Sequence, residues 1–164
     1  MTARIFQLNT SPGGVPKLPV LEAEVKTLGL VGDDHRFPNI HGGPDRAVCL
    51  FSLDRILELQ AEGHPIFPGA VGENVTVAGL DWPQVIPGTR LLLGDAVIEI
   101  TKYTNPCNTI GEYFTGEAFD RISQTKHPGW SRVYARVLKP GVLRVGAPVV
   151  FESSSTAQSR NRER

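Results

Sequence analysis

The order of apolar and polar residues predicts short β-strands along most of the chain. Residues 23–28 alternate between the two kinds with a period of two, which is typical of a strand with one buried face. Residues 47–51 form a continuous apolar segment and predict another strand. Further short strands, separated by turns rich in Gly and Pro, are expected at residues 5–8, 74–77, 90–93, 96–101, 133–138, 142–145 and 149–151.

One α-helix is expected directly after the apolar strand. Ser52 is a suitable N-cap, Leu53, Ile56 and Leu57 follow at helical spacing, and Gly63 ends the pattern. The weakly patterned residues 111–123 are expected to contain another short helix. The chain is therefore predicted to be mainly β, and the close spacing of its strands favours a meander or a barrel.

Two segments depart from this regular pattern. Residues 29–45 contain four glycines, two prolines and many ionisable side chains, and they show no sustained apolar period. A loop of this length inside a compact domain is usually functional. Residues 152–164 hold Ala157 as their one apolar residue, so they are predicted to be a disordered tail. Residues 1–151 are expected to form one folded domain.

Composition and charge argue against several classes of protein. The chain has 164 residues, of which 40% are hydrophobic, and 17 Lys and Arg balance 17 Asp and Glu. This neutrality argues against nonspecific binding of nucleic acid or of an anionic membrane. The longest apolar run is too short to cross a membrane, and the N-terminus lacks the apolar core of a signal peptide. We therefore expect a cytoplasmic protein whose two cysteines are free thiols.

The loop at 29–45 carries the first candidate site. A metal site there would use His35, His41 and an aspartate, although this spacing fits no regular zinc framework. Alternatively, Arg36 and Arg46 could bind a phosphate group with the help of backbone N–H groups beside the glycines. The acidic and basic side chains could also simply pair with one another on the surface.

Cys107 is the second candidate. It lies in a polar segment, Thr104-Asn105-Pro106-Cys107-Asn108-Thr109, just beyond a predicted strand. A partly exposed thiolate there could be a nucleophile, a sulfur carrier or a soft metal ligand, and a Cys–His hydrolase would pair it with His41 or His127. Cys49, inside the apolar strand, is expected to be a small buried hydrophobe.

Two further segments could contribute polar groups. The segment Gly69-Ala70-Val71-Gly72-Glu73-Asn74 uses two glycines to bring a Glu-Asn pair to the start of a strand. The alternative is a plain turn that Asn74 closes. In the strand that follows Gly129, alternation places Arg132, Tyr134 and Arg136 on one face. That face is either a solvated edge or an anion-binding surface.

In combination these features resemble the MOSC domain, the family named after the C-terminal part of molybdenum-cofactor sulfurases. The resemblance covers about residues 5–151 and favours the small stand-alone bacterial type. The motifs that carry it are Gly29-Leu30, Gly32-Asp33, His41-Gly42-Gly43, Arg46-Ala47-Val48, Gly72-Glu73-Asn74, Gly94, Pro106-Cys107 and Tyr134 with Arg136-Val137-Leu138.

The resemblance implies a closed, mostly antiparallel β-barrel of complex topology that binds a molybdopterin-type cofactor. At the family's cysteine position, Cys107 would be a thiolate ligand of molybdenum or would carry sulfur to it. Cofactor-binding residues are then expected among Arg36, His41, Arg46, Asn74, Asn108 and Arg132.

Two functions follow from the resemblance. The first is an oxidoreductase module that reduces N-oxygenated or N-hydroxylated substrates with electrons from a separate redox protein, because nothing in the chain resembles a flavin, haem or iron–sulfur site. The second is a carrier that delivers sulfur or cofactor through a persulfide on Cys107. The chain is too short for the pyridoxal-phosphate domain of full sulfurases, so a carrier would need a cysteine-desulfurase-type donor.

Overall fold

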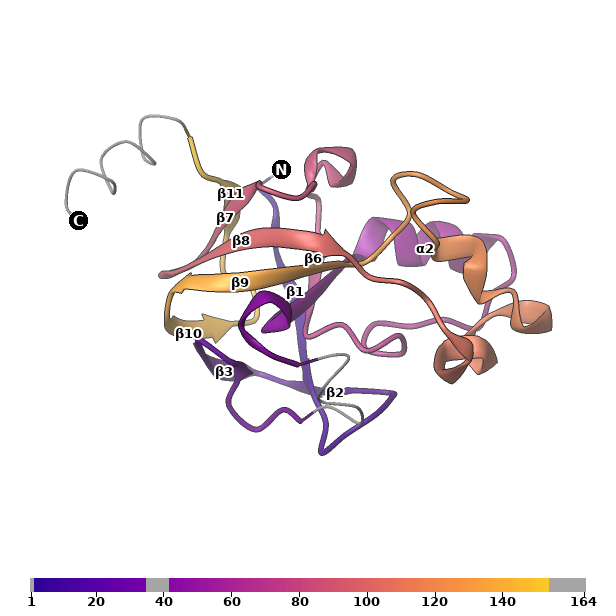
Figure 1. Cartoon of the computed structure of the whole chain (residues 1–164), viewed down its shortest axis with the longest axis horizontal. Helices are drawn as coiled ribbons and strands as arrows, with labels where there is room; N and C mark the ends of the chain where they lie inside the picture. The colour runs from indigo at the N-terminus through magenta and orange to yellow at the C-terminus, as the bar shows by residue number, and fades with distance from the viewer. Residues whose placement is uncertain (1, 35–41, 154–164) are drawn as a thin grey trace.

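The computed structural model describes residues 2–34 and 42–153. Within these ranges the chain forms strands, one α-helix and several 3-10 helices (Figure 1). The helical elements are η1 (Pro44–Arg46), α2 (Leu53–Ala61), η2 (Trp82–Gln84), η3 (Asn108–Tyr113), η4 (Thr115–Glu117) and η5 (Phe119–Ile122). The strands are β1 (Arg4–Thr10), β2 (Leu18–Val20), β3 (Glu22–Lys26), β4 (Gly29–Leu30), β5 (Val48–Ser52), β6 (Val75–Ala78), β7 (Arg90–Leu93), β8 (Ala96–Tyr103), β9 (Val133–Lys139), β10 (Gly141–Arg144) and β11 (Val149–Phe151).

The strands form two sheets. The larger sheet has eight strands in the order β11-β7-β8-β9-β5-β6-β1-β2, and the smaller has three in the order β10-β3-β4. The pairings are antiparallel except for β5 and β6, where Leu50 lies opposite Val75 in a parallel register. Parallel neighbours need a crossover connection, and α2 lies in the connection between these two strands. The fold is therefore mainly β with mixed sheets.

The expected closed barrel is not supported. The eight-stranded sheet ends at β11 on one side and at β2 on the other, and the described residues form no ladder that joins these edges. The chain before β11 does approach β1, where Arg4 and Pro148 form an isolated bridge. Two backbone hydrogen bonds of 2.9 Å flank the bridge, from Val149 N–H to Ala3 O and from Ile5 N–H to Ala147 O. The contact forms no longer ladder among the described residues, and β11 pairs with β7 instead, which strand spacing in the sequence does not reveal.

Most of the predicted elements are confirmed. The predicted strands at 90–93 and 149–151 match β7 and β11 residue for residue, and the other predicted strands differ by one to a few residues at their ends. The helix begins after Ser52, whose side chain accepts a hydrogen bond from the Arg55 N–H at 3.2 Å. The two short strands β2 and β4 were not predicted, because two or three residues show no period and β2 contains Pro19.

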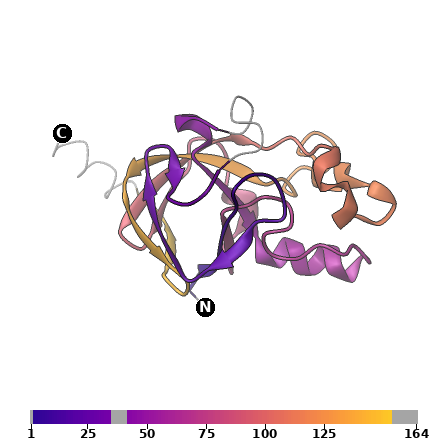
Figure 2. The same ribbon diagram turned by 90° about the horizontal axis from the view of Figure 1, so that it is seen from below.

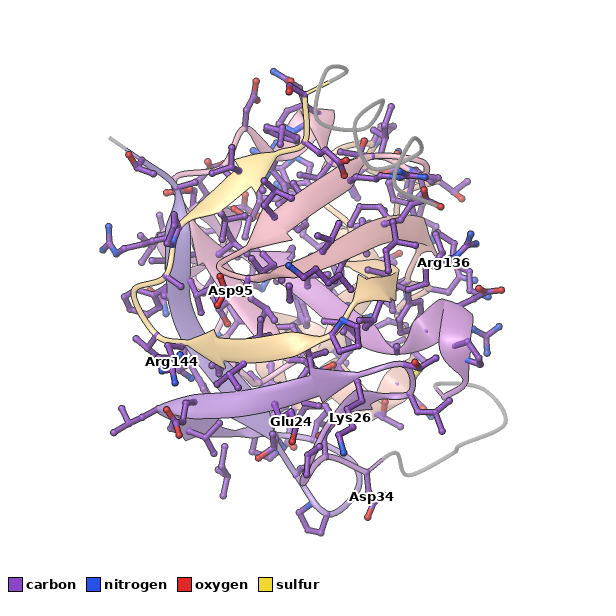
Figure 3. The ribbon with its side chains drawn as sticks, turned by 90° about the vertical axis from the view of Figure 1, so that its left-hand side faces the viewer. Glu24, Lys26, Asp34, Asp95, Arg136 and Arg144 are labelled. Atoms are coloured by element: carbon purple, nitrogen blue, oxygen red, sulfur yellow. The ribbon has the colours of Figure 1, made fainter. Side chains whose placement is uncertain are left out.

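The 3-10 helices η3, η4 and η5 replace the short helix that was predicted at 111–123. They lie beside α2 at one end of the molecule (Figures 1 and 2). Hydrogen bonds hold this end together: the Thr115 N–H donates to His64 Nδ1, and Arg121 makes two bonds to the carboxylate of Glu62. The three-stranded sheet turns a charged face outward, on which Glu24, Lys26 and Arg144 are visible in Figure 3.

Candidate functional site

A cleft of about 660 Å³, partly open to solvent, lies where the loop before β2 meets β5, β9 and the segment after β8. Both cysteines of the chain contribute to its walls. So do two cationic side chains, an acidic one, and apolar side chains that form the remaining surface. The lining residues are Gly14, Val15, Lys17, Asp34, Cys49, Val71, Gly72, Asn105, Cys107, Thr109, Ile110, Arg132 and Tyr134.

Strand pairing explains why Arg132 and Tyr134 share this cleft. Tyr134 lies opposite Cys49 in the β5–β9 register, and Arg132 precedes it by two residues on the same face. The predicted alternation is thus confirmed for these two side chains. Arg136, predicted on the same face, is not among the lining residues and instead forms ion pairs with Glu99 and Asp45 at 3.1 Å and 3.3 Å.

Arg132 is one of the two buried cations of the cleft. It is only 6% exposed, and its Nη1 donates to the carbonyl oxygen of Val71 at 2.6 Å. Its Nε is buried and has no hydrogen-bond partner among the described residues. A buried donor without a partner costs about 1–3 kcal/mol, so Arg132 retains an unused capacity to bind an acceptor.

Lys17 is the second cation and is held by a buried network. Its Nζ lies 2.7 Å from Asp33 Oδ1, and that oxygen also accepts the Ser11 N–H at 2.9 Å. The other carboxylate oxygen accepts from Asn74 Nδ2 at 2.8 Å. Lys17 is 5% exposed, so this pair fixes the ammonium group at the cleft wall rather than in bulk solvent.

The two cysteines differ in their surroundings. Cys107 is half-buried, and its Sγ lies 2.9 Å from Thr109 Oγ1. Cys49 is buried on β5, as predicted for a small hydrophobe, and burial raises the pKa of its thiol to about 11 against the opposing effect of Arg132. Although it borders the same cleft, Cys49 is therefore protonated near neutral pH.

Glu73 lies behind the cleft wall, directly after the lining residue Gly72. Its side chain has no exposed surface, and this burial raises its pKa to about 7, while hydrogen bonds and Arg132 oppose the rise. Thr76 Oγ1 donates to Glu73 Oε2 at 3.0 Å, whereas Oε1 has no partner among the described residues. A buried carboxyl group with this pKa changes charge close to neutral pH.

The structure brings together only part of the set predicted from sequence. Cys107 and Arg132 line the cleft, and Arg46 stands at its border, with Cζ 6.0 Å from the centre of the Tyr134 ring. Asn74 is buried in the network around Asp33, and Asn108 is exposed at the start of η3; neither lines the cleft. Arg36, His41 and the proposed metal ligand His35 lie outside the described residues.

Lys17 and Asn105 are lining residues that were not assigned a role from the sequence. Asn105 stood within a motif already noted, so its neighbour Cys107 could have indicated it. Lys17 had no such signal, because it comes from a turn-rich loop distant from that motif in the chain. In the described ranges no three His, Cys, Asp or Glu side chains gather in a way that could hold a metal ion. No helix there is long and apolar enough to cross a membrane.

The family model of the MOSC domain matches residues 38–150, and the chain therefore belongs to the MOSC domain family. Protein YiiM of Escherichia coli (strain K12) is 30% identical over 148 residues, which are 87% of this chain and 65% of that protein. A protein of Gibberella moniliformis named "Reductase" is 33% identical over 119 residues, which are 69% of this chain and 20% of that protein. The chain thus spans less than two thirds of either relative.

The fold is also similar to solved structures. The crystal structure of YiiM from Escherichia coli superposes with a TM-score of 0.70 at 25% identity, over 93% of this chain and 70% of that one. The similarity extends over nearly the whole chain, well beyond the residues that the family model matches.

Proposed function

We propose that this MOSC domain binds a molybdopterin-type cofactor in the cleft and serves as a reductase of N-oxygenated substrates. The observation that carries the proposal is the buried guanidinium of Arg132, whose Nε faces no acceptor among the described residues. Together with the fixed ammonium group of Lys17, it offers charge-assisted donors of the kind that a phosphate group needs.

The other lining residues fit the remaining parts of such a cofactor. Cys107 would supply a thiolate, which is a soft anionic donor suited to molybdenum in a sulfur-rich environment. The apolar surfaces of Val15, Ile110 and Tyr134 suit a flat ring system, and Asn105 can bond to its polar edge. Arg46 at the border of the cleft, together with Arg36 and His41, stays a predicted contact.

When bound, the cofactor would supply a metal centre that accepts oxygen from the substrate and exchanges electrons. Reduction of an N–OH group to N–H consumes two electrons and two protons and releases water. The chain's own residues would confine the reaction: Cys107 holds the metal, and Lys17 and Arg132 fix the anionic end. Thr109 Oγ1, 2.9 Å from Cys107 Sγ, can donate a hydrogen bond that orients the sulfur toward the cleft.

The similarity to a protein named "Reductase" supports a reductive role. Since this chain corresponds to only 20% of that relative, the source of electrons is proposed to be a separate redox protein or domain. The proposed substrates, N-hydroxylated bases and related compounds, rest on the resemblance of the motifs to small bacterial members of the family.

Elemental analysis of the protein made in a host with an intact cofactor pathway tests this proposal. We expect molybdenum approaching one atom per chain, a sharp loss in Cys107→Ser, and little change in the control Glu58→Gln, a substitution at an exposed position of α2 outside the cleft. Wild-type protein should also reduce N-hydroxyadenine when a reduced viologen dye supplies electrons. A wild-type protein without molybdenum would refute the reductase, and a persulfide on Cys107 by mass spectrometry would then favour the sulfur carrier.

A further inference from the structure

The charges around the cleft nearly cancel. The charged residues among its described lining are Lys17, Asp34 and Arg132. Lys17 is paired with Asp33, and the carboxyl group of Glu73 lies near enough to Arg132 to interact with it electrostatically. With every carboxyl group ionised, the two cations are outweighed by three acidic groups. A multiply charged anion therefore meets less attraction than the two cations alone would provide.

Glu73 is the acidic group whose charge can change most readily. It is completely buried, and burial places its pKa at about 7, so both of its protonation states are populated near neutral pH. It receives one side-chain hydrogen bond, from Thr76, and its Oε1 has no partner among the described residues. Hydrogen bonds with the backbone of Gly69 and of Glu73 itself, and the charge of Arg132, favour the ionised form, but the effect of burial outweighs them.

The charge that Glu73 faces is that of Arg132. Of the groups that interact with it electrostatically, Cys49 on β5 is a neutral thiol with a pKa of about 11, and Thr76 on β6 is uncharged. Arg132 at the start of β9 is the cation. Its Nε and Glu73 Oε1 each lack a hydrogen-bond partner, so the two groups interact through space without a direct bond between these atoms.

We infer that binding of an anion in the cleft is coupled to proton uptake by Glu73, which thereby sets the anion affinity of the site. An anion bound to Arg132 brings a negative charge close to the carboxylate of Glu73. In a poorly solvated environment the two negative charges repel each other, so the bound anion favours the protonated form of Glu73. Linkage is reciprocal: protonation of Glu73 strengthens anion binding to the same extent that the anion strengthens protonation. The inference rests on the proposed function, because both place an anion in the same cleft.

Sulfate is a suitable probe because, unlike phosphate, it does not change its own charge near neutral pH. We expect the dissociation constant of sulfate, measured by calorimetry, to be about fivefold or more higher at about pH 8.5 than at about pH 6. Binding should take up protons, which is measured by repeating the titration in two buffers of different ionisation enthalpy. In protein labelled with ¹³C at the Glu carboxyl carbon, saturating sulfate should raise the one pKa that lies near 7.

Three variants locate the effect. Glu73→Gln should bind sulfate with an affinity nearly independent of pH, since the amide carries no charge, whereas Glu58→Gln, a change at an exposed carboxylate of α2, should behave as the wild type. Arg132→Gln should abolish binding, which shows that the ion occupies the cleft. If Glu73→Gln fails to fold, the proton uptake measured in two buffers and the ¹³C titration of the wild-type protein still test whether anion binding protonates Glu73.

The inference is overturned if sulfate does not bind, if binding survives in Arg132→Gln, or if the pH dependence persists in Glu73→Gln. An unchanged pKa near 7 in saturating sulfate would overturn it as well. These measurements need no molybdenum, so their failure is distinguishable from failure of the proposed function, which the metal content of the purified protein decides.

Discussion

Asn74 and Cys49 bind each other through both backbone and side chain. The Asn74 N–H donates to the Cys49 carbonyl oxygen at 2.8 Å, and the Cys49 N–H donates to Asn74 Oδ1 at 3.0 Å. This pair adjoins the parallel pairing of β5 and β6, which begins with Leu50 opposite Val75. It connects the strand that carries a cleft cysteine to the loop that carries Glu73.

Replacing Asn74 with Ala should therefore destabilise the protein strongly. The change removes the acceptor of Cys49 N–H and the donor to Asn9 O and Asp33 Oδ2, all in buried or half-buried positions. We expect the free energy of unfolding in urea to fall by about 3 kcal/mol or more, since each buried group without a partner costs about 1–3 kcal/mol. The exposed Asn108→Ala should cost no more than about 0.5 kcal/mol. Equal losses in the two variants would contradict this role of Asn74.

Gly69 is expected to tolerate no side chain. Its φ is +90°, and an added Cβ would collide with the backbone oxygen of Lys17, whose N–H in turn donates to Gly69 O at 2.9 Å. Gly88 is the matched control, because its φ is +93° and nothing lies within 4 Å of an added Cβ. Both Ala variants carry the backbone strain of about 1–2 kcal/mol, and Gly69→Ala should lose about 1–3 kcal/mol more in thermal or urea unfolding. Equal stability of the two variants would show that the loop moves freely.

The two thiols should react at very different rates. Cys49 is buried with a pKa of about 11, so only about one molecule in a thousand carries its thiolate at pH 8. Cys107 is half-buried at the cleft, and iodoacetamide should modify it first, as peptide mapping by mass spectrometry can show. In urea both should react at similar rates. Faster labelling of Cys49 in the folded protein would contradict the assignment.

The buried carboxyl group of Glu73 should make stability depend on pH. Its pKa is raised from 4.5 to about 7 by burial, so between these values the folded protein binds more protons than the unfolded chain. Relative to Glu73→Gln, the wild-type free energy of unfolding should be highest below about pH 4.5 and fall by about 3 kcal/mol by pH 7 or above. Urea titrations of both proteins across this range measure the difference, and a constant difference would contradict the raised pKa.

The regular elements could be predicted from sequence where their signal is local. Ser52 and the spacing after it identify α2, and the period of two around Val25 identifies β3. β2 and β4 could not be found this way, since they are too short to show a period and exist because a neighbouring strand pairs with them. The sequence also could not show that the large sheet stays open, because this depends on a tertiary contact, the isolated bridge between Pro148 and Arg4 of β1.

The candidate site was predictable only in the parts that carry a motif. Cys107 and Arg132 stood out by their polar or alternating surroundings, and both line the cleft. Lys17 became a candidate only through its tertiary contact with Asp33, sixteen positions away. Glu73 matters because it is completely buried and its Oε1 has no hydrogen-bond partner among the described residues, and neither property can be read from the residues beside it.

The cleft takes its walls from chain segments as far apart as Gly14 and Tyr134. Contacts between such distant positions form late, because closing long loops must precede them. During synthesis, a chain that has not yet emerged as far as β9 lacks Arg132 and Tyr134 and has no complete pocket. Any ligand of this cleft must therefore be acquired after the sheet has assembled, and its retention will report on the integrity of the entire domain.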